Sequence, residues 1–330
     1  MLYRRDSFGF SASVLLFLAC VSSALAPLSD AVAQAPSGFK VARVIQTAFS
    51  TDIAIGPDGM LYRAGGGGLE VIDADGRVIG GLSSEQAESS GVVSHFFPQA
   101  IAFDSSEILH ILNDDGTVIR FHPDRSLSTV SIFSTGAAGS VGASATDMAM
   151  DADGNYYILT IYSVSGIDAG VSKFSPNGDL VFTLPAGTFD AVAGGTPTAL
   201  AISKGGELHV LVTHPGRAGS VQVFDLSGGY RGRLRLPGDI ERDQLTNLFT
   251  DRSGRVIVNA RSKRGLDVLL TFSADRKVAA RTLSGLSRRK GVGLVRHLEL
   301  LRGLAFDAKG NMYAVQENSP IVVYAPRLRY

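Results

Sequence analysis

Oxygen-bearing side chains recur at nearly even intervals along this sequence and could support ligand or metal binding. They are Asp52, Asp147 and Asn247, and each stands directly before a short apolar run. If those runs are equivalent strands of a repeating fold, the three side chains converge and could hold a hard divalent cation such as Ca²⁺. Asp or Asn before a strand can instead bond nearby backbone amides, which requires no ligand and no cofactor. Both interpretations are open from the sequence.

A second set of polar residues stands one position earlier in each of six repeats. Its members are Thr51, Gln99, Thr146, Thr198, Thr246 and Arg302. We expect these residues to surround the mouth of a central channel, where they could contact a polar ligand. Threonine hydroxyls in such positions can equally bond the backbone of a neighbouring repeat. The two sets together are the predicted ligand-binding residues of the channel.

The elements that must position these residues come from an internal repeat of roughly 48 residues. Each repeat begins with a short apolar strand that ends in an Asp/Gly turn, as in 147–154 (DMAMDADG) and 303–310 (GLAFDAKG). A second β-rich run follows at once, and a third strand ends in another turn, as in 174–178 (FSPNG). Asp-Gly and Asn-Gly suit hairpin turns because these residues tolerate positive φ. The repeating unit is therefore a four-stranded antiparallel meander.

The two ends of the chain predict how the repeats close. The sixth repeat stops after 321–326 without a fourth strand, whereas residues 39–44 form a strand-like segment that has no repeat of its own. Pairing these two segments would remove the exposed sheet edges between the ends. The predicted fold is an all-β, six-bladed β-propeller of four-stranded antiparallel blades, closed by the N-terminal strand.

The blades resemble those of NHL-repeat propellers. The resemblance lies in 98–104 (PQAIAFD), 197–201 (PTALA) and 310–313 (GNMY). It implies the fold and not one activity, since such propellers include binding scaffolds, lyases and lactonases. Gluconolactonase-like relatives hold a divalent metal with Glu, Asn and Asp at positions where this chain has mostly threonine. Amidating-lyase relatives use histidines at the channel mouth, and here His95, His214 and His297 share no repeated spacing, so no catalytic residue can be assigned.

The first 33 residues are predicted to be an export signal. Arg4 and Arg5 supply its positive start, residues 14–21 its apolar run, and Ala31-Val32-Ala33 a cleavage site before Gln34. A twin-arginine route and lipidation at Cys20 remain alternatives. We therefore expect residues 34–330 to form the propeller, in the periplasm or outside the cell. No later segment has eighteen consecutive apolar residues, so no transmembrane segment is expected.

Charge is divided unevenly along the chain. Residues 34–230 hold 9 Lys/Arg against 20 Asp/Glu, a net charge of −11, and residues 231–330 hold 20 against 9, a net charge of +11. One face should carry the long loops, at 83–97, 131–146, 162–170, 185–196 and 283–301. The following cations map to that face: Arg261, Lys263, Arg264, Arg288, Arg289, Lys290, Arg296 and Arg302. Nucleic acid is not expected as a partner of an exported protein, so the cluster favours an acidic protein or another anionic ligand. Ordinary solvated charge is the alternative.

The leading hypothesis is an exported binding or scaffold propeller that presents its loop-rich face to a protein or an anionic ligand. The alternative is a metal-dependent hydrolase, lactonase or lyase that acts at the channel mouth. The absence of a recognisable catalytic motif favours the first. The sequence does not specify the ligand or the oligomeric state.

Overall fold

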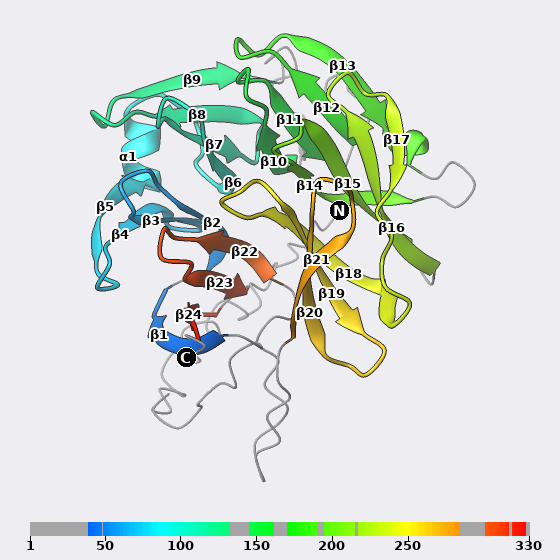
Figure 1. Cartoon of the computed structure of the whole chain (residues 1–330). Helices are drawn as coiled ribbons and strands as arrows, with labels where there is room; N and C mark the ends of the chain where they lie inside the picture. The colour runs from blue at the N-terminus through cyan, green and yellow to red at the C-terminus, as the bar shows by residue number, and fades with distance from the viewer. Residues whose placement is uncertain are drawn as a thin grey trace, which may run out of the picture. The chain divides into compact units, whose positions relative to one another are not determined.

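Short apolar, β-rich runs separated by Asp/Gly turns form the strands of a six-bladed β-propeller (Figure 1). The structure is a computed structural model, and it describes residues 39–47, 49–132, 145–161, 170–189, 195–214, 217–283, 301–316 and 319–327. Within these ranges, strands β1 to β24 make six antiparallel sheets of four strands each. The all-β propeller prediction is therefore confirmed.

The first three blades follow chain order, from the inner strand at the channel to the outer strand. Blade 1 contains β2 (Ser50–Ile55), β3 (Leu61–Gly65), β4 (Gly68–Ile72) and β5 (Val78–Ser83). Blade 2 contains β6 (Pro98–Phe103), β7 (Leu109–Asn113), β8 (Thr117–Phe121) and β9 (Leu127–Ser131). Blade 3 contains β10 (Ala145–Met150), β11 (Tyr156–Thr160), β12 (Gly170–Phe174) and β13 (Leu180–Pro185).

The last three blades keep this order, except that the sixth takes its outer strand from the start of the chain. Blade 4 contains β14 (Thr196–Ile202), β15 (Glu207–His214), β16 (Arg217–Asp225) and β17 (Tyr230–Arg233). Blade 5 contains β18 (Ile240–Thr250), β19 (Val256–Ser262), β20 (Asp267–Phe272) and β21 (Val278–Leu283). Blade 6 contains β22 (Leu301–Phe306), β23 (Met312–Gln316), β24 (Ile321–Pro326) and β1 (Phe39–Ile45).

Pairing of β1 with β24 closes the ring, as the two unpaired ends of the sequence predicted. The strands are antiparallel, with Phe39 opposite Pro326 and Ile45 opposite Ile321. Exposure alternates along β1, so that Ile45 is buried while Val44 keeps 43% of its surface exposed. The strand therefore contributes one face to the core and satisfies the backbone edge of β24.

Packing between blades supplies the core. In the described part of the chain, buried apolar side chains form six clusters, one at each junction between neighbouring blades. The junction of blades 6 and 1, for example, buries Ile45 from β1, Ile53 from β2 and Tyr313 from β23. Each blade thus buries both of its faces against its neighbours, which is why the ring must close.

Carboxylates organise the turns on the face opposite the channel mouth. In blade 3, Asp151 Oδ1 accepts the amides of Asp153 and Asn155 at 3.1 and 2.9 Å, and Gly154 takes the left-handed conformation with φ of 80°. Turns without glycine place Arg125 or Arg276 in the same conformation, at φ of 69° and 62°. The Asp/Gly motif is therefore a structural signal for turn formation.

The long connection from Ser83 to Phe97 contains a helix that the sequence interpretation treated as loop. Helix α1 (Ser84–Ser89) begins with a capping box, in which Ser83 accepts the Gln86 amide and the Gln86 side chain accepts the Ser83 amide. The Ser-x-x-Gln spacing was the missed signal. A 3₁₀ turn, η2 (Ala186–Thr188), follows β13. The other predicted long loops lie largely outside the described residues, among which no helix is long and apolar enough to cross a membrane.

Ring closure can be tested with two substitutions in β1. Ile45→Ala should lower the free energy of unfolding by about 2–5 kcal/mol, because it leaves a cavity at the junction of blades 6 and 1. Val44→Ala, the matched control on the exposed side of the same strand, should change it by less than about 0.5 kcal/mol. Urea denaturation of both variants measures the difference. Equal effects of the two substitutions would contradict the buried, ring-closing role of β1.

Candidate functional site at the channel mouth

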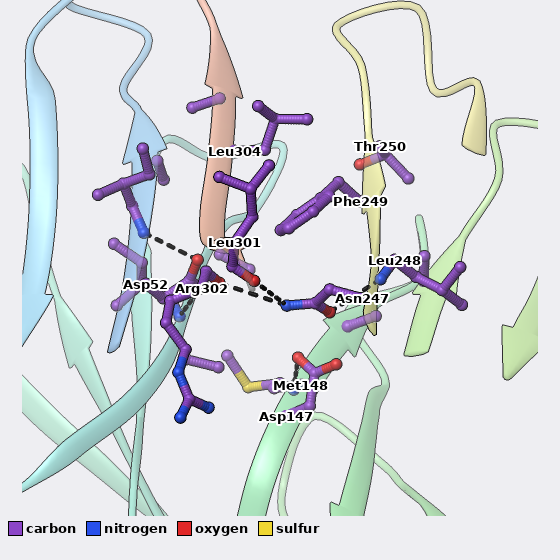
Figure 2. A pocket seen from close by; sticks show the side chains of 18 of the residues that line it. Asp52, Asp147, Met148, Asn247, Leu248, Phe249, Thr250, Leu301, Arg302 and Leu304 are labelled. Carbon is purple, nitrogen blue, oxygen red and sulfur yellow. Dashed lines mark hydrogen bonds between the residues drawn. The ribbon is translucent and has the colours of Figure 1, made fainter. Parts of the chain in front are cut away.

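The inner strands of all six blades surround a central cavity of about 840 Å³ (Figure 2). Both predicted sets of polar residues line it: Thr51, Asp52, Gln99, Thr146, Asp147, Thr198, Thr246, Asn247 and Arg302. The structure therefore brings together the channel residues that the repeat alignment selected. Whether they bind a ligand stays a prediction.

Two aspartates use their carboxylates to join neighbouring blades. Asp52 Oδ1 accepts the amide of Ile53 in its own strand at 2.8 Å, and Oδ2 accepts the amide of Ile101 in blade 2 at 2.9 Å. Asp147 repeats the arrangement, with Met148 in its own strand and Leu200 in blade 4, both at 2.8 Å. The carboxylates link blade 1 to blade 2 and blade 3 to blade 4.

Asn247 makes the corresponding link from blade 5 to blade 6. Its Oδ1 accepts the Leu248 amide at 2.8 Å, and its Nδ2 donates to the Leu301 carbonyl at 3.1 Å (Figure 2). The blades that receive these links carry Ala100, Ala199 or Gly303 at the same position. At Gly303 a Cβ would lie 2.8 Å from the Ile53 backbone nitrogen, so a side chain does not fit there. At the channel, these three side chains thus link the inner strands of blades 1 and 2, 3 and 4, and 5 and 6.

These contacts bear on the predicted cation site. Both carboxylate oxygens of each aspartate already accept backbone amides, which is the structural role that the sequence left open. Among the described residues, no group of three His, Cys, Asp or Glu side chains could hold a metal ion. A cation held by Asp52, Asp147 and Asn247 stays a hypothesis. Such a cation would compete with the backbone amides for the aspartate oxygens.

Burial of the two aspartates changes their protonation. Burial raises the pKa of Asp52 to about 8, against the opposing hydrogen bond from the Ile101 amide and with a further contribution from the charge of Asp147. Burial likewise raises the pKa of Asp147 to about 7, opposed by the amides of Leu200 and Met148. Near neutral pH the channel therefore carries less negative charge than two ordinary aspartates would give it.

The polar residues one position before the linking residues and their equivalents differ in hydrogen bonding from blade to blade. In the linking blades, Thr51 donates to the Pro98 carbonyl at 2.8 Å, Thr146 lies 3.5 Å from the Leu159 carbonyl, and the Thr246 hydroxyl is buried without a hydrogen-bond partner. In the receiving blades, the side chains of Gln99 and Thr198 make no hydrogen bond within the described part of the chain. Arg302 is exposed and extends from β22 into the pocket (Figure 2). The accessible side chains of this set that make no hydrogen bond in the described ranges, Gln99 and Thr198, thus belong to blades 2 and 4.

The cations of the same face are only partly described. Arg261 is half-buried at the end of β19, and Lys263 and Arg264 are exposed in the turn that follows. The other predicted members of the cluster (Arg288, Arg289, Lys290 and Arg296) lie outside the described residues, as does His297. His214 is buried in blade 4. His95 lies next to Phe97, which in turn lies next to Phe49, and neither phenylalanine was among the predicted site residues.

The sequence matches no protein-family model and no curated protein. Solved structures do resemble the fold. A gluconolactonase from Xanthomonas campestris superposes with a TM-score of 0.58 at 14% identity, over 90% of this chain and 93% of that one. A streptogramin B lyase gives 0.51 at 10% identity, over 86% and 96%. The extracellular domain of BT4673 from B. thetaiotaomicron gives 0.51 at 12% identity, over 89% of this chain and 40% of that chain.

At these identities the comparisons show a shared six-bladed fold and do not select an activity. Lactonase, lyase and extracellular domain all use it. The NHL assignment that the blade motifs suggested remains a resemblance. The function of this chain must therefore be argued from its own side chains.

The raised pKa values of the two channel aspartates predict a pH-dependent stability. Between pH 4 and 8 the folded protein holds protons that the unfolded chain, with ordinary aspartate pKa values near 4, has released. The free energy of unfolding should therefore fall as pH rises from 5 to 8, by up to about 1.4 kcal/mol per pH unit for each carboxyl that is protonated in the folded state and ionised in the unfolded chain. Asp147→Asn should weaken this dependence and lower stability at both pH values, because asparagine has one acceptor oxygen and its Nδ2 would face an amide donor where the Asp147 side chain accepts two.

Urea denaturation at pH 5 and pH 8 provides the measurement, with Asn247→Asp as the reverse control. That variant adds a third buried carboxyl and should lose stability at pH 8 more than at pH 5. A wild-type protein whose stability rises with pH, and an unchanged pH dependence in Asp147→Asn, would show that these carboxyls are ionised in the folded state.

Proposed function

We propose that this protein is an exported binding propeller that takes an anionic ligand, or an acidic segment of a protein partner, at the channel-mouth face. The observation that carries the proposal is the combination of exposed cations and unbonded polar groups on that face. Arg302 is exposed in the cavity, and Gln99 and Thr198 have side chains available for hydrogen bonds. Export rests on the predicted signal in residues 1–33.

The rest of the mouth supports binding through its rigidity. Each linking residue bonds its own strand and the next blade, so the inner strands that carry Gln99, Thr198 and Arg302 are fixed to their neighbours. A preformed set of groups loses little conformational entropy when a ligand is bound. The cations at the end of blade 5 add long-range attraction for a negatively charged partner.

Catalysis by a metal-dependent hydrolase, lactonase or lyase is the second candidate. The feature that favours it is the pair of channel carboxyls with raised pKa values, since such groups are common in active sites. We prefer binding because each oxygen of both carboxylates already accepts a backbone amide and is therefore occupied in the fold. Metal analysis of the purified protein separates the two. A tightly bound, stoichiometric divalent ion would support the enzyme, and its absence after purification without chelator would support the binding protein.

Salt-dependent retention on immobilised dextran sulfate tests the anion-binding face. The triple variant Arg261→Gln, Lys263→Gln, Arg264→Gln should elute at clearly lower salt than wild type, because a clustered positive potential is lost. The matched control removes three exposed cations from turns on the opposite face, by Arg77→Gln, Lys277→Gln and Lys309→Gln. It should elute close to wild type. If both variants shift equally, retention reflects net charge alone and the assignment of the face is wrong.

A further inference from the structure

Three ring side chains lie together at the channel-mouth end of blades 1 and 2. Phe49 and Phe97 have centroids 6.5 Å apart with planes inclined by 25°, and His95 and Phe97 have centroids 6.3 Å apart at 6°. The two phenylalanines are half-buried, and the His95 side chain is 66% exposed. Phe49 and Phe97 stand two positions before the mouth residues Thr51 and Gln99. We call Phe49, Phe97 and His95 the aromatic shelf.

The ring angles limit what the shelf can bind. Parallel rings in van der Waals contact are about 3.5–4 Å apart, so a centroid distance of 6.3 Å means a lateral offset of roughly 5 Å. Part of each ring face is therefore uncovered by its neighbour. Because the planes are nearly parallel, the rings form stepped faces of similar orientation and not a box of crossed walls around a compact cation. The shape suits a ligand with a flat ring.

A buried arginine fixes one end of the shelf. Arg63 is 1% exposed, pairs with Glu70 at 2.9 Å and donates from Nη1 to the Phe49 carbonyl at 2.8 Å. The glycine-rich β3–β4 hairpin passes beside it, where a Cβ on Gly65 would lie 2.0 Å from the same carbonyl. The glycine of this hairpin therefore leaves room for the Phe49 backbone.

A buried amide fixes the other end. Asn113 is fully buried; its Oδ1 accepts the Phe97 amide at 2.6 Å and its Nδ2 donates to the His95 carbonyl at 2.8 Å. The equivalent positions in the other four repeats are Ser144, Thr196, Gln244 and Leu300. The repeat itself does not require rings there, so the shelf is a local feature of two blades that buried polar groups hold in place.

The polar groups around the shelf suit hydroxyl donors. Glu88 Oε1 lies 3.9 Å from His95 Nδ1 and also accepts the Phe96 amide. Asp114 lies close by, since its backbone amide donates to the Phe97 carbonyl at 3.2 Å. Gln99 offers an unbonded amide at the adjacent mouth. Carboxylates accept hydrogen bonds from sugar hydroxyls, and their negative charge disfavours an anionic ring.

We propose that the aromatic shelf binds one neutral pyranose ring of a glycan, with the C–H face of the sugar on the rings and its hydroxyls on Glu88, Asp114 and Gln99. The inference rests on the proposed function, because it specifies part of the ligand that the channel-mouth face would take. Anionic groups of the same glycan would meet the cations of blades 6 and 5, which follow blade 1 around the mouth on the side away from blade 2.

Saturation-transfer difference NMR tests the shelf, with the methyl pyranosides of glucose, galactose, mannose and xylose as probes. At least one should receive saturation from wild type on the protons of one ring face. Phe97→Leu keeps an apolar side chain and removes the ring. It should raise the dissociation constant of the sugar roughly two- to tenfold. Tyr230→Leu removes a 56% exposed ring from the outer strand of blade 4 and should bind as wild type does.

Three results would overturn the proposal: no transfer to any of the four sugars, unchanged binding in Phe97→Leu, or stronger Phe97-dependent binding of tetramethylammonium or indole. Comparable thermal unfolding of the two leucine variants controls for folding. The triple variant at Arg261, Lys263 and Arg264 should keep full sugar binding. The two assays therefore separate the proposals. Sugar binding without retention on dextran sulfate would contradict the anion-binding face alone, and retention without sugar binding would contradict the shelf alone.

Discussion

The inner strands of this propeller expose backbone amides and carbonyls at blade junctions, and these groups need partners. Asp52, Asp147 and Asn247 meet that need by bonding their own strand and the next blade at once. One side chain thereby fixes both the start of an inner strand and the spacing of two blades. The apolar clusters between blades supply most of the stabilisation, and these polar links specify how neighbouring inner strands are aligned.

The links also decide which groups remain for a ligand. Where one blade supplies the linking side chain, its neighbour carries alanine or glycine at the same position. In blades 2 and 4 the polar residue just before that alanine, Gln99 or Thr198, faces the channel without a hydrogen bond among the described residues. The ring therefore presents a pattern in which blades 2 and 4 carry an unbonded polar side chain and blade 6 carries the exposed Arg302. On one side of the mouth this pattern borders the aromatic shelf and its carboxylates, and on the other the cations of blade 5.

Sequence reasoning predicted the fold because each repeat carries the same strand and turn signals, and because 39–45 and 321–326 were unpaired segments of matching type. It also placed the channel residues, since one alignment column becomes one ring. It could not choose between a cation and backbone amides as partners of Asp52, because both use the same oxygens and only the position of Ile101 decides. The shelf escaped prediction because Phe49 and Phe97 meet through loops held by Arg63 and Asn113, contacts that no repeat pattern encodes.

The links between blades are the central claim, and amide hydrogen exchange in Asp52→Ala tests them most directly. The Ile101 amide should exchange roughly tenfold faster than in wild type, because its acceptor in blade 1 is gone, while the Leu200 amide, bonded to Asp147, should keep its protection. An unchanged exchange rate at Ile101 would mean that Asp52 does not bond blade 2, and would return its carboxylate to the list of candidate ligand-binding groups.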